Sequence, residues 1–349
     1  MNRSRSLLKY SISRLLLAPV MLWLISTLVF LLLRVAPGDP VDAILGIRAD
    51  YAAREALRVK LGLDASLLTQ YFKYLNCLIH GDLGESLNNQ EPVRQLISNT
   101  LPASIELGVI AIIIAITIGI SVGFTGISRP EGKTDLIGRL FGIGTYALPP
   151  FWAAMLIQIF FAVILGWLPV GGRFPPNLIE PEGSGFLIFD SIRTGNLQAL
   201  LGSIRHIILP ASTLGILLSG IFSRSLRLNL GKILTTNYIQ AAKSRGIKDG
   251  QVILKHAFPN ALLPVLTIAG LTIASLIGGA LLIEITFSWP GIALGLQEAI
   301  SQRDYPVVQG IVVIISSLVV TISLLVDIAI AFIDPVSYTH LTLPTKRIV

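Results

Sequence analysis

The residues with the greatest potential for chemistry lie in one short polar segment, from Asn237 to Asn260, between two long apolar runs. Lysine and arginine dominate this segment and its approach, and Asp249 is the only acid there. A strongly basic loop between two membrane-spanning runs stays on the cytoplasmic side of the bilayer. The cations are Arg224, Arg227, Lys232, Lys243, Arg245, Lys248 and Lys255.

Other residue types with catalytic or ligating chemistry do not form clusters. His80, His206, His256 and His340 are scattered along the chain, and Cys77 is the only cysteine. We therefore expect neither a metal site nor an intramolecular disulfide. No glycine-rich loop followed by Lys-Ser or Lys-Thr occurs, so we also expect no nucleotide site, no cofactor and no catalytic residue in this chain.

The pattern of the basic segment predicts two short helices broken at a glycine. The first runs from Tyr238 to Arg245, and Gly246 can take the left-handed conformation that ends a helix. Asp249 can cap a second helix. Pro259 suits the first turn of the membrane-spanning helix that follows.

This pattern resembles the cytoplasmic coupling loop of ABC-importer permeases, which reads Glu-Ala-Ala, three residues, Gly and, in the peptide branch, a later Pro-Asn. Gln240 replaces the acidic residue, at a position that varies among peptide-type permeases. In the family the loop docks in a cleft of the ATPase subunit, and small residues allow close approach. The alternative is an ordinary amphipathic loop with an incidental glycine. The resemblance implies ATPase coupling for Gln240, Ala241, Ala242, Gly246, His256, Pro259 and Asn260.

Further motifs extend the resemblance from about residue 8 to Pro335. Taken together and in their order along the chain, these motifs resemble the first-named permease of dipeptide, oligopeptide and nickel ABC importers. The tail, residues 336–349, departs from the family's short basic end, and we interpret it as an appended or spurious terminus. The motifs are Gly38-Asp39-Pro40, His80-Gly81-Asp82-Leu83-Gly84, Gly166-Trp167-Leu168-Pro169, Pro290-Gly291 and Arg303-Asp304.

Composition predicts an all-α membrane protein with six transmembrane helices and a small external helical cap. The chain of 349 residues is 53% apolar and 13% charged, and several runs exceed the ~20 apolar residues that span a bilayer. The formal charge of +7 is explained by membrane topology and does not indicate nucleic-acid binding, because the cations gather on loops that would face one side of the membrane. The predicted spans are 14–34, 102–127, 138–166, 207–225, 259–286 and 307–333.

The spans divide the chain into four parts and place both termini in the cytoplasm. These parts are the N-terminus with the first span (1–34), an external cap region (35–100), a permease domain (101–335) and the tail. The permease domain includes a coupling loop at 226–256. In the cap, Asp50 can begin one helix and Leu67 to Leu78 can form a second. A second external stretch, 167–206, is expected to be extended or loop-like.

Charges and prolines within the spans are the remaining candidates for function. Glu284 lies where the resemblance puts the translocation pathway and outer gate, with a purely structural role equally open. Pro149 and Pro150 interrupt the third span, either to line a cavity or simply to kink the helix. Glu106 is expected to pair with a neighbour at the membrane interface.

The resemblance implies the permease subunit of an ATP-driven importer in the cytoplasmic (inner) membrane of a prokaryote. It implies a second homologous permease as heterodimer partner, two ATPase subunits and an external substrate-binding protein. The expected substrates are peptides, with nickel or another small solute as the alternative. An ion-coupled secondary transporter is an alternative of another class, but it would need carboxylates near midspan. A channel or scaffold would not need a glycine-hinged loop.

Overall fold

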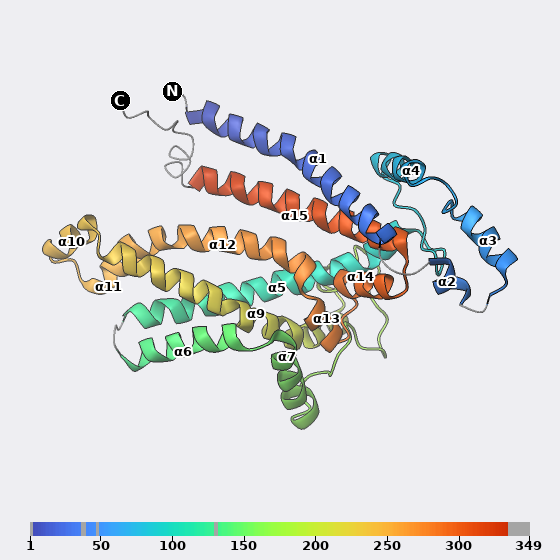
Figure 1. Ribbon diagram of the computed structural model, residues 1–349. Coiled ribbons are helices and arrows are strands. Elements are labelled where there is room, and N and C mark those ends of the chain that lie inside the picture. Colours follow the sequence, from blue (N-terminus) through green and yellow to red (C-terminus); the bar gives the residue numbers. More distant parts are fainter. Residues whose placement is uncertain (1–2, 36–39, 47–48, 129–131, 334–349) are drawn as a thin grey trace, which may run out of the picture.

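The computed structural model describes residues 3–35, 40–46, 49–128 and 132–333, and over these ranges the protein is a bundle of helices without β-strands (Figure 1). Five helices are long and apolar enough to cross a membrane, and a sixth span is added if one bent pair counts as a single span. The all-α membrane class predicted from composition is confirmed. The tail, residues 336–349, lies outside the described residues.

Most of the long helices run further than the apolar runs alone suggested, but the fifth predicted span (259–286) is interrupted at Ala280, where its long helix has ended. The long helices are α1 (Arg3–Val35), α5 (Val93–Ser128), α9 (Leu197–Leu234), α12 (Phe258–Gly279) and α15 (Tyr305–Ile333). The second predicted span (102–127) therefore forms the C-terminal part of α5, and the fourth (207–225) forms only the middle of α9. Polar residues at both ends of α9 continue the helix beyond the apolar stretch, where it packs against α8 (Leu187–Arg193) and α10 (Asn237–Ser244), because tertiary packing supplies most helical stability in proteins.

The bundle has α5 and α9 at its centre, packed closely along their length. Small residues make this possible, since a Cβ on Gly119 would lie 2.6 Å from the Phe222 Cβ and 2.7 Å from the Ser219 carbonyl oxygen. A Cβ on Gly123 would likewise lie 3.0 Å from the Ser223 carbonyl oxygen. Gly119 and Gly123 form a small-xxx-small pair, a pattern typical of the interfaces between membrane helices.

The third predicted span is not one straight helix. It consists of α6 (Lys133–Ala147), α7 (Pro150–Gln158) and a π-helix (Ile159–Ile164), and the two halves meet at an angle of 104°. Pro149 and Pro150 lie at the bend, where their rings and missing N–H groups interrupt the helical hydrogen bonds. In Figure 1 α6 runs along the bundle whereas α7 turns away from it.

One end of the bundle carries the predicted cap. It includes α2 (Pro40–Leu45), α3 (Tyr51–Lys60) and α4 (Leu67–Ile79), so the two predicted cap helices are present. Asp50 occupies the predicted N-cap position of α3 but accepts no side-chain capping bond. The serine before α4, Ser66, does cap its helix, by accepting from the Thr69 N–H.

The second external stretch is more helical than expected. Within 167–206 the chain forms α8 (Leu187–Arg193) and the first turns of α9, so the prediction of a wholly extended or loop-like segment was wrong. Its prolines and most of its glycines lie within 169–185, before α8 begins. Two short helices, α13 (Leu281–Thr286) and α14 (Ile292–Ser301), complete this end of the molecule.

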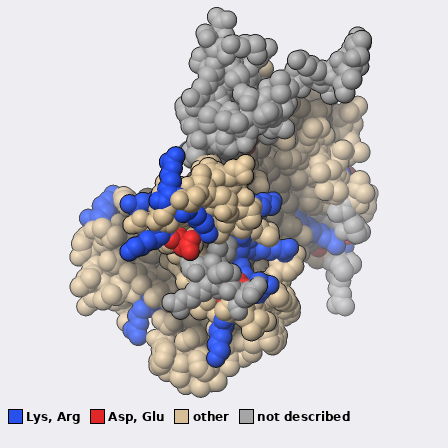
Figure 2. Space-filling view, turned by 90° about the vertical axis from the view of Figure 1, so that its left-hand side faces the viewer, with Lys and Arg blue, Asp and Glu red and all other residues tan. Residues whose placement is uncertain are grey.

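The opposite end of the bundle collects the segments predicted to face one side of the membrane. The start of α1, the end of α5, the start of α6 and the end of α15 all point towards it (Figure 1). Beyond them lie α10 (Asn237–Ser244) and α11 (Asp249–Gln251), which connect α9 to α12 through a second π-helix, Val252–Ala257. This end is called the basic end below, after its lysines and arginines (Figure 2).

Candidate functional site

The candidate site is the connection between α9 and α12, and its first feature is an abrupt helix end. Gly246 has a φ of +78°, a conformation that L-residues other than glycine rarely adopt. The Gly246 N–H donates to the Lys243 carbonyl at 2.9 Å, and the Ile247 N–H to the Ala242 carbonyl at 3.4 Å. These two bonds form a Schellman motif, which satisfies carbonyls at the end of α10. The predicted helix end at Gly246 is confirmed, with α10 shifted by one residue.

Helix α10 presents one face to the protein core and another to solvent. Ile239 is completely buried, and Ala242 is partly buried against the same apolar cluster. Gln240 and Ala241 are exposed. A helix anchored by one large apolar side chain can thus offer a short polar side chain and a methyl group to another molecule. Gly246 itself is exposed at the tip.

One hydrogen bond from Asn260 ties α10 to the start of α12, and a second joins Asn260 to the π-helix before it. The Asn260 side-chain amide lies 3.1 Å from the Tyr238 hydroxyl oxygen and donates to the His256 carbonyl at 3.0 Å. His256 and Asn260 are exposed, so the structure brings both close to α10 without burying them. The resemblance implied that Asn260 belongs to the site. The sequence does not identify Tyr238 as its partner, because no local sequence pattern links side chains that are 22 residues apart.

Pro259 lies in the first turn of α12, as predicted. The helix continues without a break from the π-helix before it, where the Phe258 N–H donates to the Ile253 carbonyl. Proline has no N–H to offer to the residue four positions earlier. A wider π turn accommodates that missing bond, and π-bulges of this kind are frequent at functional sites.

The predicted capping role of Asp249 was wrong. Lys248 occupies the N-cap position of α11, and no side-chain capping bond forms. Asp249 instead forms an ion pair with Lys243 across the turn at Gly246, with 3.2 Å between the Lys243 Nζ and the Asp249 Oδ1. Long-range charge attraction competes with local capping here, since an aspartate at the first helical position can do either. Both side chains are substantially exposed, so the pair adds little stability.

Cations surround this connection on all visible sides. Figure 2 looks onto the basic end and shows lysine and arginine side chains spread over it, with few acids between them. Lys243, Arg245, Lys248 and Lys255 are all exposed. Among the residues that the structure describes, no group of three His, Cys, Asp or Glu side chains could hold a metal ion. The described residues of this connection thus form an exposed and strongly basic surface.

Comparison with known proteins matches almost the whole chain. The family described as binding-protein-dependent transport system inner membrane component matches residues 101–336, and the corresponding N-terminal family matches residues 7–108. The chain belongs to this family of inner-membrane permeases. It is a multi-pass membrane subunit of an ABC importer, and a transport component, not an enzyme.

Characterised permeases resemble the chain over nearly its full length. It is 38% identical to the dipeptide transport system permease DppB of Alkalihalophilus pseudofirmus, over 94% of this chain and 99% of that protein. It is 37% identical to the di/tripeptide permease DppB of Pseudomonas aeruginosa, over 89% and 93%. A probable D,D-dipeptide permease of Escherichia coli, DdpB, is 34% identical, over 89% and 92%.

In this permease Glu284 is buried and does not face an open cavity. Its carboxylate accepts from the Ser104 hydroxyl at 2.6 Å and from the Leu294 N–H at 2.8 Å. Leu294 is in the first turn of α14, so Glu284 caps that helix from a different helix, α13. The geometry therefore supports the structural role that the sequence left open for this residue.

The proline break lies beside a cavity of about 340 Å³ in the permease. Pro150 lines it together with residues of α9 and α12–α13, whereas Pro149 does not. The position of Pro150 beside this cavity is compatible with a role in the translocation pathway, which stays a prediction. The other lining residues include Thr145, Leu214, Gly220, Ser275 and Ile283.

A network at the capped end of the permease was only partly visible in the sequence. Glu106 pairs with Arg173 at 2.8 Å, which confirms the expected partner at the interface, and accepts the Ile188 N–H at 2.8 Å. Asp304 accepts from the Ser86 hydroxyl at 2.5 Å and from the Leu87 N–H, which ties the cap to the start of α15. No local sequence pattern predicts hydrogen bonds between residues that are this far apart in the chain.

Proposed function

We propose that this permease imports peptides and that the exposed face of α10 is the surface on which separate ATPase subunits act. The observation that carries the docking proposal is the exposure of Gln240 and Ala241 on a helix anchored by buried Ile239. A partner that pushes on this short rigid helix moves α9 and α12 together, because α10 connects them.

The proposal of a peptide substrate is supported by the functions of the relatives. Proteins 34–38% identical over most of this chain are named as permeases for dipeptides, di/tripeptides and D,D-dipeptides. In our proposal a second homologous permease pairs with this chain, two ATPase subunits bind at α10 and its counterpart, and an external binding protein delivers the peptide at the cap. The chain itself supplies no phosphate-cradling loop.

The proposed orientation puts the basic end, and both termini, in the cytoplasm. The lysines and arginines of α10, α11 and the π-helix after them support this, because positively charged loops are retained on the cytoplasmic side. The cap of α2–α4 then faces outward, where a binding protein can reach it.

Replacement of Gly246 by valine tests the coupling role of α10. A β-branched residue resists a φ of +78°, at a cost of about 1–2 kcal/mol. We expect uptake of a radiolabelled dipeptide to fall by roughly tenfold, with an unchanged amount of permease in the membrane and reduced co-purification of the ATPase.

Two matched variants control for a general effect of substitution. Asn tolerates the left-handed conformation, so Gly246→Asn should retain most uptake. Gly250→Val places the same side chain four residues on, where a Cβ meets nothing within 4 Å and φ is ordinary, and should transport normally. Normal uptake by Gly246→Val at normal membrane level would remove the coupling role from this loop.

A further inference from the structure

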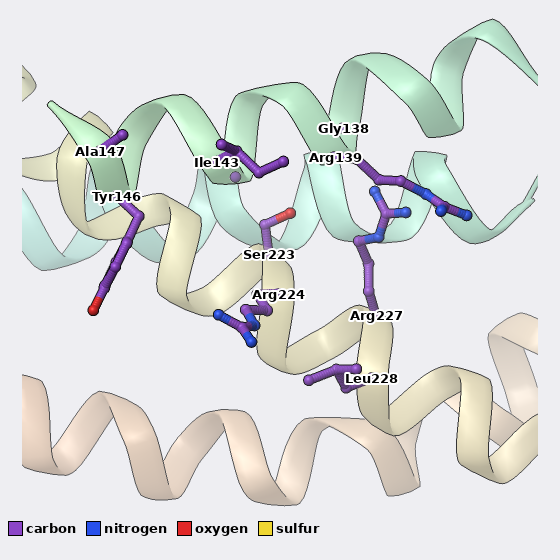
Figure 3. Close-up of a pocket in the computed structure, with 10 residues that line it drawn as sticks. Gly138, Arg139, Ile143, Tyr146, Ala147, Ser223, Arg224, Arg227 and Leu228 are labelled. Carbon is purple, nitrogen blue, oxygen red and sulfur yellow. The ribbon is translucent and has the colours of Figure 1, made fainter.

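A groove between α6 and α9 near the basic end has features that transport of peptides does not explain. Its volume is about 470 Å³, and both helices contribute to its walls. The close-up in Figure 3 shows the lining residues on the facing stretches of α6 and α9, with Ser223 and Arg227 directed from α9 towards α6. The groove is lined by Gly138, Arg139, Gly142, Ile143, Tyr146, Ala147, Ser223, Arg224, Arg227 and Leu228.

The polar groups of the groove are concentrated at one end and are mainly guanidinium groups. Arg227 and Arg139 both form ion pairs with Asp135, and the distance from Arg139 is 2.7 Å. One carboxylate therefore balances the charge of two arginines only in part. Arg224 is exposed one turn away and has no acidic partner among the residues that the structure describes. This end therefore carries an excess of positive charge.

The remainder of the groove is apolar and open to the surroundings of the bundle. On α6, Ile143 and Tyr146 follow Arg139 at spacings of four and seven residues, which puts all three on one face. Ile143 is 64% exposed and Tyr146 is 81% exposed. In a membrane such side chains contact lipid chains, whereas arginine seeks an anion or water.

One buried polar group at the groove lacks a partner. Ser223 is 1% exposed, and its hydroxyl makes no hydrogen bond with any described residue. In Figure 3 its oxygen points from α9 towards α6, on the side of the groove where Arg227 lies. Because unpaired buried hydroxyls are costly, a ligand oxygen at this position would be favourable.

We propose that this groove binds an anionic phospholipid, with the phosphate at Arg224 and Arg227 and an acyl chain along Ile143 and Tyr146. Guanidinium groups bind phosphate through paired hydrogen bonds. Basic pockets between membrane-spanning helices are known to hold acidic headgroups. An acyl chain has no polar atoms to leave unpaired on the apolar walls, whereas the amide groups of a peptide would lose their hydrogen bonds there.

The depth of the groove fits a headgroup. The predicted apolar spans begin at 138 in α6 and end at 225 in α9, so Arg139, Arg224 and Arg227 lie at the boundary between apolar and polar segments. The proposal goes beyond the coupling role of α10 and does not depend on it. Only the choice of leaflet, the inner one, rests on the proposed orientation.

The test is native mass spectrometry of the assembled importer titrated with phosphatidylglycerol or with phosphatidylcholine of the same acyl chains. We expect preferential binding of phosphatidylglycerol. Arg224→Gln should weaken this binding about five-fold, the effect of one cation near an acidic headgroup. Lys232→Gln, which removes a charge from the same end of α9 outside the groove, should leave it unchanged.

A second pair of variants probes the apolar part of the groove without altering charge. A Cβ at either Gly142 or Gly144 meets nothing within 4 Å, so leucine can be introduced at both without a clash at that atom. Gly142 lines the groove and Gly144 does not. Gly142→Leu should reduce phosphatidylglycerol binding by roughly tenfold, and Gly144→Leu should bind as the wild type does.

Several results would overturn the proposal. Equal binding of the two lipids, or equal losses in Arg224→Gln and Lys232→Gln, would exclude a specific site. Displacement of the bound lipid by inorganic phosphate would identify a free-anion site, and displacement by a dipeptide would identify a substrate site. Binding to the isolated permease but not to the assembled importer would show that another subunit covers the groove. Loss of coupling in Gly246→Val would affect none of these outcomes.

Discussion

At the scale of single residues, Glu284 and Gly291 depend on each other. A Cβ on Gly291 would lie 2.2 Å from the carboxyl carbon of Glu284, which is fully buried and caps α14. The φ of Gly291 is −94°, so space and not backbone conformation requires the glycine. The residue permits a buried carboxylate to reach the helix that it caps.

Gly291→Ala is therefore expected to destabilise the permease by about 1–3 kcal/mol through overpacking. The measurement is thermal unfolding of the purified protein in detergent. Gly250→Ala, where a Cβ meets open space, should change stability by no more than about 0.5 kcal/mol. Similar midpoints for both variants would mean that the Glu284 carboxylate can move at little cost.

Asp190 in α8 makes stability depend on pH at the capped end. Burial opposes ionisation of Asp190, but hydrogen bonds from Ser184 and Gly185, together with the charge of Arg193, outweigh it and hold the pKa below its ordinary value of 3.8. A carboxyl with a depressed folded pKa stabilises the protein fully above its unfolded pKa. That contribution is lost as the pH falls through the folded pKa.

We expect Asp190→Asn to lower the unfolding midpoint at pH 7 by about 2 °C or more. The difference from wild type should persist down to about pH 4 and shrink below it, as the wild-type carboxyl becomes protonated. Ser184→Ala, which removes one donor to the carboxylate, should show part of the same effect. A difference that is constant from pH 7 to pH 3 would contradict the proposed ionic origin.

At the scale of elements, α10 is anchored by buried Ile239, and a hydrogen bond between Tyr238 and Asn260 tethers it to the start of α12. Removing one hydrogen bond of this kind costs about 0.5–1.5 kcal/mol. We expect Tyr238→Phe to increase amide hydrogen exchange in Asn237–Ser244 by a few-fold. Exchange measured by mass spectrometry in the same sample should remain unchanged in α5.

The tether can be isolated by a double-mutant cycle. Asn260→Ala should also raise exchange in α10, and adding Tyr238→Phe should then have little further effect, because the shared bond has already been removed. Additive effects of the two substitutions would show that the side chains act independently and that α10 is positioned by Ile239 alone.

At the scale of the whole molecule, the predicted orientation can be tested with one introduced thiol. In a Cys77→Ser background, Ser244→Cys adds an exposed thiol on α10. We expect no labelling by a membrane-impermeant maleimide in intact cells, and full labelling once the membrane is opened. Labelling in intact cells would place the basic end outside and overturn the proposed topology.

The bent third span also belongs to this scale. The sequence shows a proline pair in the middle of an apolar run, and a kink or a cavity-lining break are both consistent with that pattern. The 104° angle between α6 and α7 depends on what each half packs against. α6 packs along α9 and α5, whereas α7 turns away from the bundle and contacts α13 as well as α9.

The sequence by itself determined the apolar spans, the gathering of cations at one end, and the end of α10 at Gly246. These features are local, because they follow from the length of apolar runs and from the backbone freedom of one glycine. Only the tertiary structure decided that Asp249 pairs with Lys243 and that Glu284 caps α14. It also placed Arg227 of α9 on Asp135 of α6, at the lipid-facing groove that we propose. Each of these contacts joins side chains on different elements, and a choice among competing partners depends on geometry that local sequence does not encode.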